Sequence, residues 1–169
     1  MVEPVHAIDG GRGNSMNLYA PDAPPSVFGD HGPFVSLWQG KRAGRELPAW
    51  RDFSFEDLTP WIGRLLVVDL DFSDGIDGTY RLCGGEWVAI FDSDLTGKRY
   101  KDVMTEEVKK RSQPYLSTLF RERLVGYRVM SSYWFQRDFI KIELLDLLLS
   151  DNGSTPTQYL GVAKVFRAP

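Results

Sequence analysis

Four aspartates stand close together in the sequence and could bind a cation. Asp69 and Asp71 alternate along a predicted strand, so their side chains share one face, and Asp74 and Asp77 follow in a turn. Clustered carboxylates are the ligands that hard cations prefer. Alternating acids are also typical of the solvent-exposed face of a half-buried strand. We therefore expect these carboxylates to be solvated, and we predict no metal site.

Residues that support enzymatic catalysis are few. The chain has two histidines, His6 and His31, and neither stands near a serine or cysteine in a nucleophile motif. No cluster of histidine and cysteine has the spacing of a metal site. Arg81 could bind a carboxylate ligand or a partner's acid, or form a salt bridge with Glu86 or Asp69. We therefore expect no enzymatic activity and no catalytic residues.

Composition places the chain among ordinary globular proteins. It has 169 residues, of which 43% are apolar, and this suits one domain with a self-sufficient core. Cys83 is the only cysteine, and the N-terminus lacks the features of a signal peptide, so we expect a cytoplasmic protein. The net charge of −3 argues against general nucleic-acid binding, and no apolar run is long enough to span a membrane.

The predicted elements begin with a tail and a helical segment. Residues 1–30 are rich in glycine and proline and poor in apolar periodicity, so we expect them to form a flexible tail. Residues 31–62 form the N-terminal helical segment, in which Pro33 begins a helix and Gly44 ends it. The spacing of Phe34, Leu37 and Trp38 gives this helix an apolar stripe.

Residues 63–169 are expected to form the core. Residues 65–72 and 79–83 are typical of two strands that form a hairpin. Short helices follow, and then a longer helix begins at Thr105 and must kink or restart at Pro114. Three strands, 127–135, 139–149 and 158–166, complete the sequence, and Asn152-Gly153 indicates the turn before the last strand.

Several residues add to what this order of elements indicates, and the likeness that they support covers residues 32–166. They are Trp38, Arg42, Leu47-Pro48, Asp52, Tyr80-Arg81-Leu82, Gly84 and Leu95-Thr96-Gly97. Together they resemble the PAS_5 family, an alphaproteobacterial PAS family that was formerly a domain of unknown function. The chain departs from the family pattern at Leu145-Asp146-Leu147, where the family often has Leu-Pro-Leu, and at Trp50, where the family tends to have arginine. The resemblance implies an α+β fold with a five-stranded antiparallel sheet, helices packed on one face, and an N-terminal helix.

The resemblance leaves the ligand open, because PAS domains hold haem, flavin, small organic acids or nothing known. Haem needs an axial ligand, but neither histidine lies in the helical segment after the second strand, and Met104 would be a weak ligand. A photoreactive flavin domain carries its cysteine in an Asn-Cys-Arg motif, whereas Cys83 follows Arg81-Leu82 at the end of a strand. We therefore expect neither haem nor photoreactive flavin, and the cofactor stays unassigned.

The resemblance also places any ligand between the helical segment and the sheet. The candidate pocket residues are Trp87 and Phe91 from the helices, Met130, Trp134, Leu148 and Val162 from the strands, and Arg81 as the partner of a ligand carboxylate. A slip of one residue in a strand would exchange the inward-facing and outward-facing sets. The expected ligand is small and partly hydrophobic.

The resemblance implies a single-domain sensory or regulatory protein of bacterial signal transduction. Such a protein would bind a small ligand or a partner protein and signal through a separate effector. A ligand-free dimerisation or interaction module is the alternative, and a small α+β enzyme with a cone-shaped pocket is less favoured, because such enzymes place their long helices before the sheet. Helices in the position of 33–44 often pair two PAS domains. We therefore expect Phe34, Leu37 and Trp38 at a homodimer interface.

Overall fold

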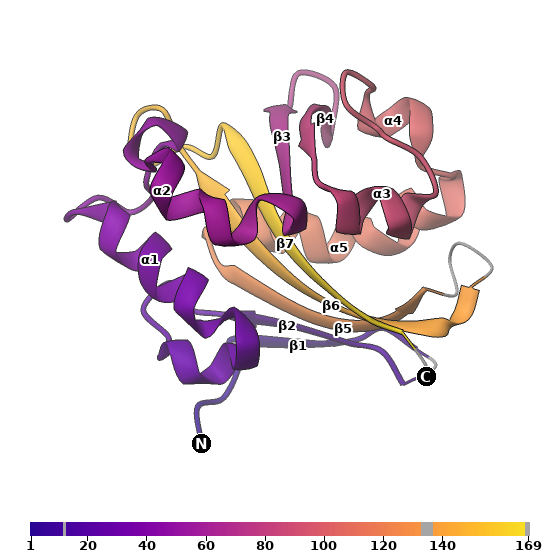
Figure 1. Cartoon of the computed structure of the whole chain (residues 1–169), viewed down its shortest axis with the longest axis horizontal. Coiled ribbons are helices and arrows are strands. Elements are labelled where there is room, and N and C mark those ends of the chain that lie inside the picture. The colour runs from indigo at the N-terminus through magenta and orange to yellow at the C-terminus, as the bar shows by residue number, and fades with distance from the viewer. Residues whose placement is uncertain (12, 133–136, 168–169) are drawn as a thin grey trace.

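A computed structural model describes residues 1–11, 13–132 and 137–167 of the chain (Figure 1). The strands are β1 (His6–Asp9), β2 (Ser15–Tyr19), β3 (Leu65–Asp71), β4 (Asp77–Cys83), β5 (Val125–Ser132), β6 (Arg137–Leu149) and β7 (Gln158–Arg167). The α-helices are α1 (Gly32–Arg42), α2 (Phe55–Leu58), α3 (Gly85–Phe91), α4 (Tyr100–Val103) and α5 (Glu106–Glu122). The 3-10 helices are η1 (Pro25–His31), η2 (Trp50–Asp52) and η3 (Thr59–Arg64). None of these helices combines the length and the apolar character that a membrane span requires.

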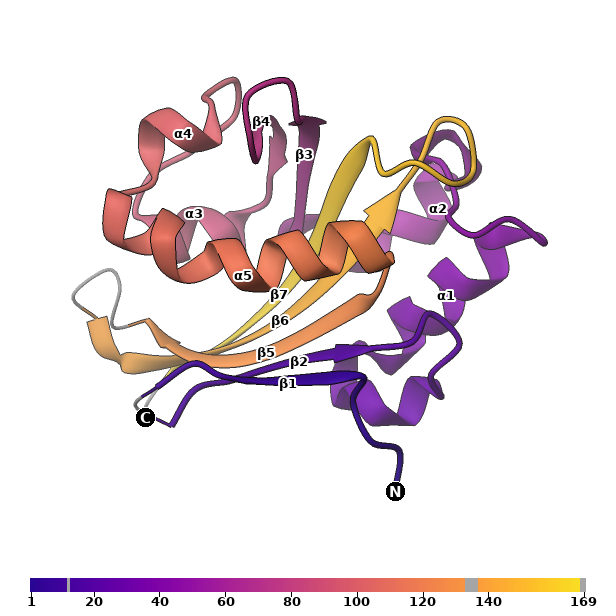
Figure 2. The same ribbon diagram turned by 180° about the vertical axis from the view of Figure 1, so that it is seen from behind.

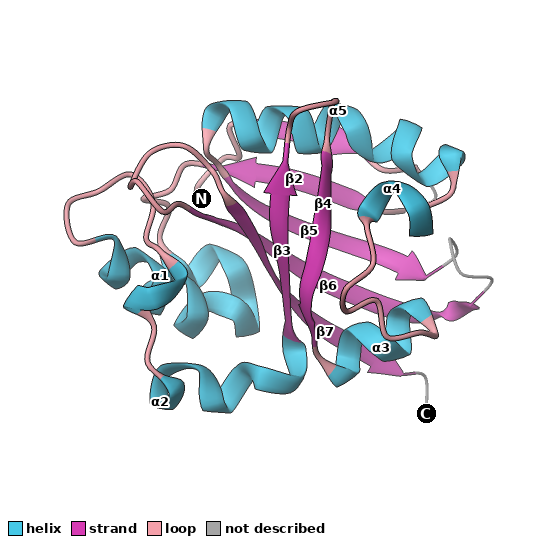
Figure 3. Ribbon diagram, turned by 90° about the horizontal axis from the view of Figure 1, so that it is seen from above, coloured by secondary structure: helices cyan, strands magenta, loops and turns pink. Residues whose placement is uncertain are grey.

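The described strands form one antiparallel sheet in the order β1-β2-β5-β6-β7-β3-β4. The predicted α+β class is confirmed, whereas the predicted number of five strands is wrong, because the described residues form seven. The five strands expected after residue 63 are neighbours in the sheet, and the hairpin of β1 and β2 extends it beyond β5 (Figure 2). The sheet twists strongly, so that β3 and β4 run across the direction of β5 and β6 (Figure 3).

The N-terminal hairpin stands where the sequence predicts a flexible tail over residues 1–30. Ser15–Tyr19 pairs with β5, and Leu18 in this strand is fully buried. Gly11 and Gly13 take φ angles of 69° and 78° between β1 and β2, a conformation that glycine adopts without strain. The glycines of this segment therefore form a tight turn between two strands, and the expectation of a flexible tail is wrong.

Helix limits follow the local signals in the sequence. Ser54 begins α2 with the predicted capping box, because its hydroxyl accepts from the Asp57 amide and its own amide donates to the Asp57 carboxylate. Thr105 caps α5, where its Oγ1 accepts from the amide of Val108 at 3.2 Å. α5 continues as one helix through Pro114, so of the two predicted alternatives, a kink or a restart, the restart does not occur. The buried side chain of Tyr115 packs in the core directly after this proline and holds the helix in place.

Alternating residues of β6 contribute to two buried clusters. Leu145 and Leu147 belong to the larger cluster, which includes residues of α1 and η1 and also the buried residues of α5. Ile142 and Leu144 belong to the smaller cluster, which includes α3 and residues of α4. Figure 1 shows α1 on one side of the sheet and α3, α4 and α5 on the other. We call the face covered by α3, α4 and α5 the inner face.

The apolar stripe of α1 packs inside the chain. Phe34 and Trp38 have no exposed surface, and the Trp38 Nε1 donates to the carbonyl oxygen of Leu148 at 3.0 Å. Leu37 is half-buried against the same larger cluster. The assignment of Phe34 and Trp38 to a homodimer interface is therefore wrong, because the sheet of the same chain already covers these side chains.

His31 immediately precedes α1 and is fully buried. Its Nδ1 lies 3.4 Å from the Nη2 of Arg64, its ring packs edge-on against Tyr127, and its Nε2 has no hydrogen-bond partner among the described residues. Burial and the nearby Arg64 charge lower the pKa of His31 from 6.5 to about 4. The junction between α1 and the sheet therefore depends on a neutral imidazole.

We predict that His31 makes the fold less stable as the pH falls. Below pH 6.5 the unfolded chain protonates this histidine, while the folded chain resists protonation down to about pH 4. The free energy of unfolding should therefore fall by about 2 kcal/mol between pH 7.5 and pH 5 through this residue alone. Urea unfolding at both pH values measures the difference.

Two variants isolate the His31 contribution to this pH dependence. His31→Gln should lose this part of the pH dependence, whereas His6→Gln, a change at a half-exposed histidine of β1, should keep it. Equal pH slopes in the wild type and His31→Gln would show that this prediction is wrong.

Candidate functional site

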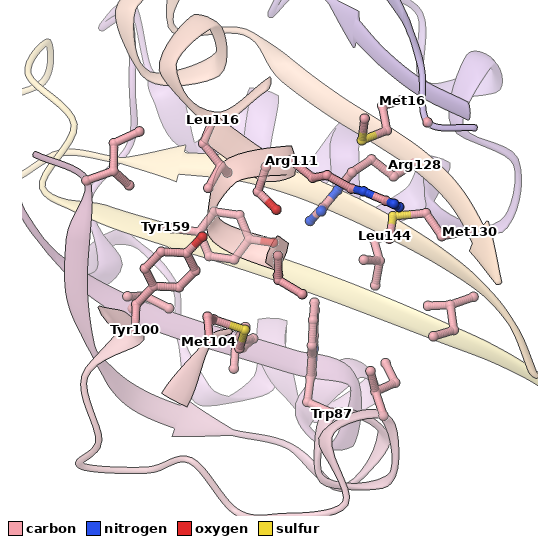
Figure 4. A pocket seen from close by; sticks show the side chains of 18 of the residues that line it. Met16, Trp87, Tyr100, Met104, Arg111, Leu116, Arg128, Met130, Leu144 and Tyr159 are labelled. Atoms are coloured by element: carbon pink, nitrogen blue, oxygen red, sulfur yellow. The ribbon is translucent and has the colours of Figure 1, made fainter. Parts of the chain in front are cut away.

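A cavity of about 380 Å³ lies between the inner face of the sheet and the helices α3, α4 and α5 (Figure 4). Most of its wall is apolar. Its apolar lining includes Leu66, Val68, Ile90, Met104, Ile142 and Leu144. The N-terminal hairpin also contributes to the wall, through Ile8 and Met16. The cavity is in the size range of pockets that hold small molecules.

Trp87 lines the cavity and is held in place by its neighbours. Its Nε1 donates to the carbonyl oxygen of Arg64 at 2.9 Å, and its ring stacks on Phe91 with centroids 5.8 Å apart. The ring lies directly over Gly161, where a Cβ would come within 2.8 Å of it. Because Gly161 has no side chain, the Trp87 ring can pack directly against β7.

A buried group of four polar side chains, which we call the Asp146 cluster, lies beside the cavity. It consists of Asp146, Arg128, Tyr115 and Tyr159. Asp146 is 0% exposed and accepts two hydrogen bonds from Arg128, from Nε at 2.7 Å and from Nη2 at 2.6 Å. The hydroxyl of Tyr115 donates to Oδ2 at 2.5 Å, and the hydroxyl of Tyr159 donates to Oδ1. Four donor atoms thus compensate for the burial of one carboxylate.

Two glycines give the Asp146 cluster its space. Gly126 in β5 and Gly161 in β7 stand directly opposite Asp146 in the two neighbouring strands. A Cβ at Gly126 would overlap the hydroxyl of Tyr115, and a Cβ at Gly161 would lie 2.7 Å from the hydroxyl of Tyr159. Larger residues at these positions would displace the tyrosines from the carboxylate.

Contacts within the Asp146 cluster shift the pKa values of Arg128 and the two tyrosines. Burial of Arg128 opposes its charge, but the adjacent Asp146 carboxylate outweighs this effect and raises the pKa of the guanidinium. Burial, together with the Asp146 charge, raises the pKa of Tyr115 and Tyr159 well above 10. Both phenols are therefore neutral donors at neutral pH. The Arg128 and Tyr159 side chains also line the cavity (Figure 4).

The four aspartates that suggested a cation site have partners within the chain. Asp77 accepts from Arg99 Nε at 2.9 Å and Nη2 at 2.6 Å and from the backbone amide of Lys101, and Asp71 accepts from Arg99 at 2.9 Å. Lys101 pairs with Asp74, and Arg81 pairs with Asp69. Asp77 is buried, so the prediction that all four lie on a solvated face is wrong for this residue. Within the described ranges, no group of three or more potential metal ligands is found.

The structure brings together only part of the predicted pocket. Trp87, Phe91 and Met130 line the cavity. Leu148 and Val162 pack instead in the larger cluster, and Val162 lies on the opposite face because β7 alternates Tyr159 and Ala163 toward the inner face. Trp134, the remaining candidate from the strands, lies outside the described residues.

Arg81 does not reach the cavity. Its side chain is 56% exposed, and its Nη1 lies 3.5 Å from Asp69 across the β3–β4 hairpin. The assignment of Arg81 as the partner of a ligand carboxylate is therefore wrong, and the alternative of a salt bridge with Asp69 is confirmed. Cys83 follows in the same strand and is half-buried, which raises the pKa of its thiol.

The sequence reasoning missed the polar residues of the cavity. Asp146 carried a usable signal, because a single carboxylate inside a long apolar strand is rarely buried without a cationic partner. Arg128 gave a weaker signal, since it stands in a moderately alternating strand two residues after Gly126. Arg111 stands in the basic run Lys109-Lys110-Arg111, a pattern typical of a solvated helix face, and it also lines the cavity.

The paired motifs used for the resemblance meet in the structure. The amide of Gly97 donates to the carbonyl oxygen of Tyr80 at 2.7 Å. The amide of Tyr80 in turn donates to the carbonyl oxygen of Lys98 at 3.0 Å. Leu95 is buried in the smaller cluster beside Tyr80. These residues therefore fasten the segment after α3 to the outer edge of β4.

No family model, no curated protein and no solved structure matches the chain.

We predict that Asp146→Asn strongly destabilises the protein. The substitution leaves the Arg128 guanidinium without its carboxylate, and breaking a buried ion pair from one side costs about 3–5 kcal/mol. Urea unfolding followed by circular dichroism measures the free energy. The matched control is Arg81→Gln, which breaks an exposed pair and should cost at most about 1 kcal/mol. Similar losses in the two variants would contradict the role of the Asp146 cluster.

Proposed function

We propose that this chain is a PAS-like sensory or regulatory protein that binds a small ligand between its helical layer and its sheet. The cavity of about 380 Å³ on the inner face is the observation that carries the proposal. Binding would favour one arrangement of the helices over the sheet, and a separate effector protein would respond to that arrangement. The size of the change is limited by how differently the ligand binds the two arrangements.

The order of elements supports the PAS-like part of the proposal. After residue 63 the chain forms two strands, the helices α3, α4 and α5, and three further strands. These five strands are contiguous in the sheet, and the three helices lie over one of its faces. The N-terminal hairpin and α1 are additions to this core, at the edge beyond β5 and on the opposite face.

The elements around the cavity offer a route from ligand to surface. Tyr115 ties α5 to the sheet through its hydrogen bond to Asp146. At the end of the same helix, Glu122 contacts His6 of the hairpin, with Oε2 and Nε2 2.7 Å apart. A ligand that enlarges the cavity would therefore act on both contacts of α5. The exposed outer surface of this helix would present the change to an effector.

A ligand-free interaction module is the alternative function. It would have no use for an apolar cavity of this size, because an unfilled cavity lowers stability. The cavity therefore favours the ligand-binding function. A homodimer and the separate effector stay predictions, and a homodimer would have to use a surface other than the buried Phe34 and Trp38. We likewise propose no enzymatic activity.

We predict that a pocket-filling substitution abolishes ligand-dependent stabilisation. A set of small metabolites is screened by thermal shift on the wild type, and a ligand at a hundredfold excess over its Kd should raise the Tm by about 5–10 °C. Met130→Trp places a large side chain in the cavity and should remove the shift. Ile62→Trp adds the same side chain at an exposed position of η3 and should preserve it.

The screen also separates the two functions. Absence of any stabilising compound, or an equal shift in Met130→Trp, would count against the ligand-binding proposal. The interaction module would then be the better account.

A further inference from the structure

Two arginines stand in the wall of an otherwise largely apolar cavity. Arg128 reaches it from β5 and Arg111 from α5, so that the sheet and the helical layer each supply one guanidinium. Figure 4 shows the two side chains on the same side of the cavity. Arg128 is mostly buried and Asp146 compensates for its charge, whereas the side chain of Arg111 is 45% exposed. The two guanidiniums are therefore the positively charged groups of the wall that the polar part of a ligand could meet.

Arg128 is oriented before any ligand binds. The Nε and Nη2 of Arg128 donate to the two carboxylate oxygens of Asp146 in a bidentate pair, and this fixes the plane of the guanidinium. An arginine carries five N–H donors, and the pair with Asp146 uses one edge of the group. The guanidinium, whose Nη1 takes no part in this pair, is therefore held at a set angle in a side chain that lines the cavity. A donor fixed in this way loses little side-chain entropy when it binds an acceptor.

Acidic groups in the wall are already engaged. Asp77 is bound by Arg99 and by the Lys101 amide, and the Asp9 carboxylate accepts from the amide of Gly11 at 2.8 Å. Arg111 pairs with Glu107 at 3.2 Å, one turn earlier on the helix, in an exposed contact that solvent screens. All four charged side chains of the wall thus have partners within the chain, and what favours an anion is that the two guanidiniums lie on the same side of the cavity.

The remainder of the wall is suited to an apolar body. Trp87, Ile90 and Ile142 form it together with the flexible side chains of Met104 and Met130. Methionine adapts its shape to different apolar partners. A molecule that satisfies both parts must therefore carry an acidic group at one end and an apolar chain or ring at the other.

We propose that the cavity binds an amphipathic carboxylate, with its carboxylate held by Arg128 and Arg111 and its apolar part against Trp87 and the methionines. The inference rests on the proposed ligand-binding function and names the chemical class of the ligand. In the bound state the carboxylate accepts from the Nη1 edge of Arg128, while Asp146 keeps the other edge. The ligand thus extends the Asp146 cluster into the cavity.

Calorimetric titration with two matched probes tests the ligand class. Octanoate and 1-octanol share an eight-carbon chain and differ in the charged group. Octanoate should bind the wild type at least about tenfold more tightly than octanol, because the charge-assisted hydrogen bonds are available only to the carboxylate. Equal affinities for octanoate and octanol, or tighter binding of octylamine titrated as a cationic control, would overturn the proposal.

Variants of the two arginines assign the binding to these residues. Arg111→Gln should weaken octanoate binding about tenfold and change octanol binding less than twofold. Arg121→Gln alters an exposed arginine of the same helix and should leave both affinities unchanged. Arg128→Lys keeps the charge but removes the planar fork, and should also lower the preference for octanoate. Because Arg111 lies outside the Asp146 cluster, its variant remains informative even if Arg128→Lys fails to fold.

The outcomes distinguish this inference from the proposed function. If octanol and octanoate bind the wild type equally and both are lost in Met130→Trp, the cavity is a ligand site and the assignment of an anion is wrong. If octanoate preference survives both arginine substitutions, the carboxylate lies elsewhere and the inference is likewise wrong.

Discussion

The buried carboxylate of Asp146 is the constraint around which the inner face is arranged. It lies in the long strand β6 and needs four donor atoms, which come from β5, β7 and α5. Gly126 and Gly161 are small because the two tyrosine hydroxyls need the space opposite Asp146. The same contacts place α5 over the sheet and present Arg128 to the cavity. Stability and the candidate function therefore share one set of interactions.

Local signals in the sequence were sufficient for most of the elements. The caps at Ser54 and Thr105 involve residues three positions apart, so the pattern alone locates the start of each helix. The hairpin of β1 and β2 was missed because its stability comes from pairing with β5, more than one hundred residues away in the sequence. Glycines in a tight turn and glycines in a disordered tail look alike until the distant partner is known.

Only those parts of the candidate site whose positions follow from the local sequence pattern could be predicted. Trp87 and Phe91 lie on one short helix, so their common environment follows from their spacing. Val162 was placed on the wrong face because strand parity depends on register, which no local pattern fixes. The Asp146 cluster joins residues from three strands and one helix at sequence separations of 13 to 31 residues from Asp146. A charged residue inside an apolar strand indicates that a buried partner exists, but the sequence does not show which residue that partner is.

The methionines offer the most direct test of the central claim, that the cavity on the inner face is a ligand site. Met16, Met104 and Met130 line it, whereas the fourth methionine of the chain, Met1, is fully exposed. The measurement is the NMR spectrum of the methionine methyl groups during titration with octanoate. Our account predicts saturable shifts of the three cavity methyls and none for Met1. Unchanged cavity methyls at saturating octanoate, or equal shifts of all four methyls, would contradict it.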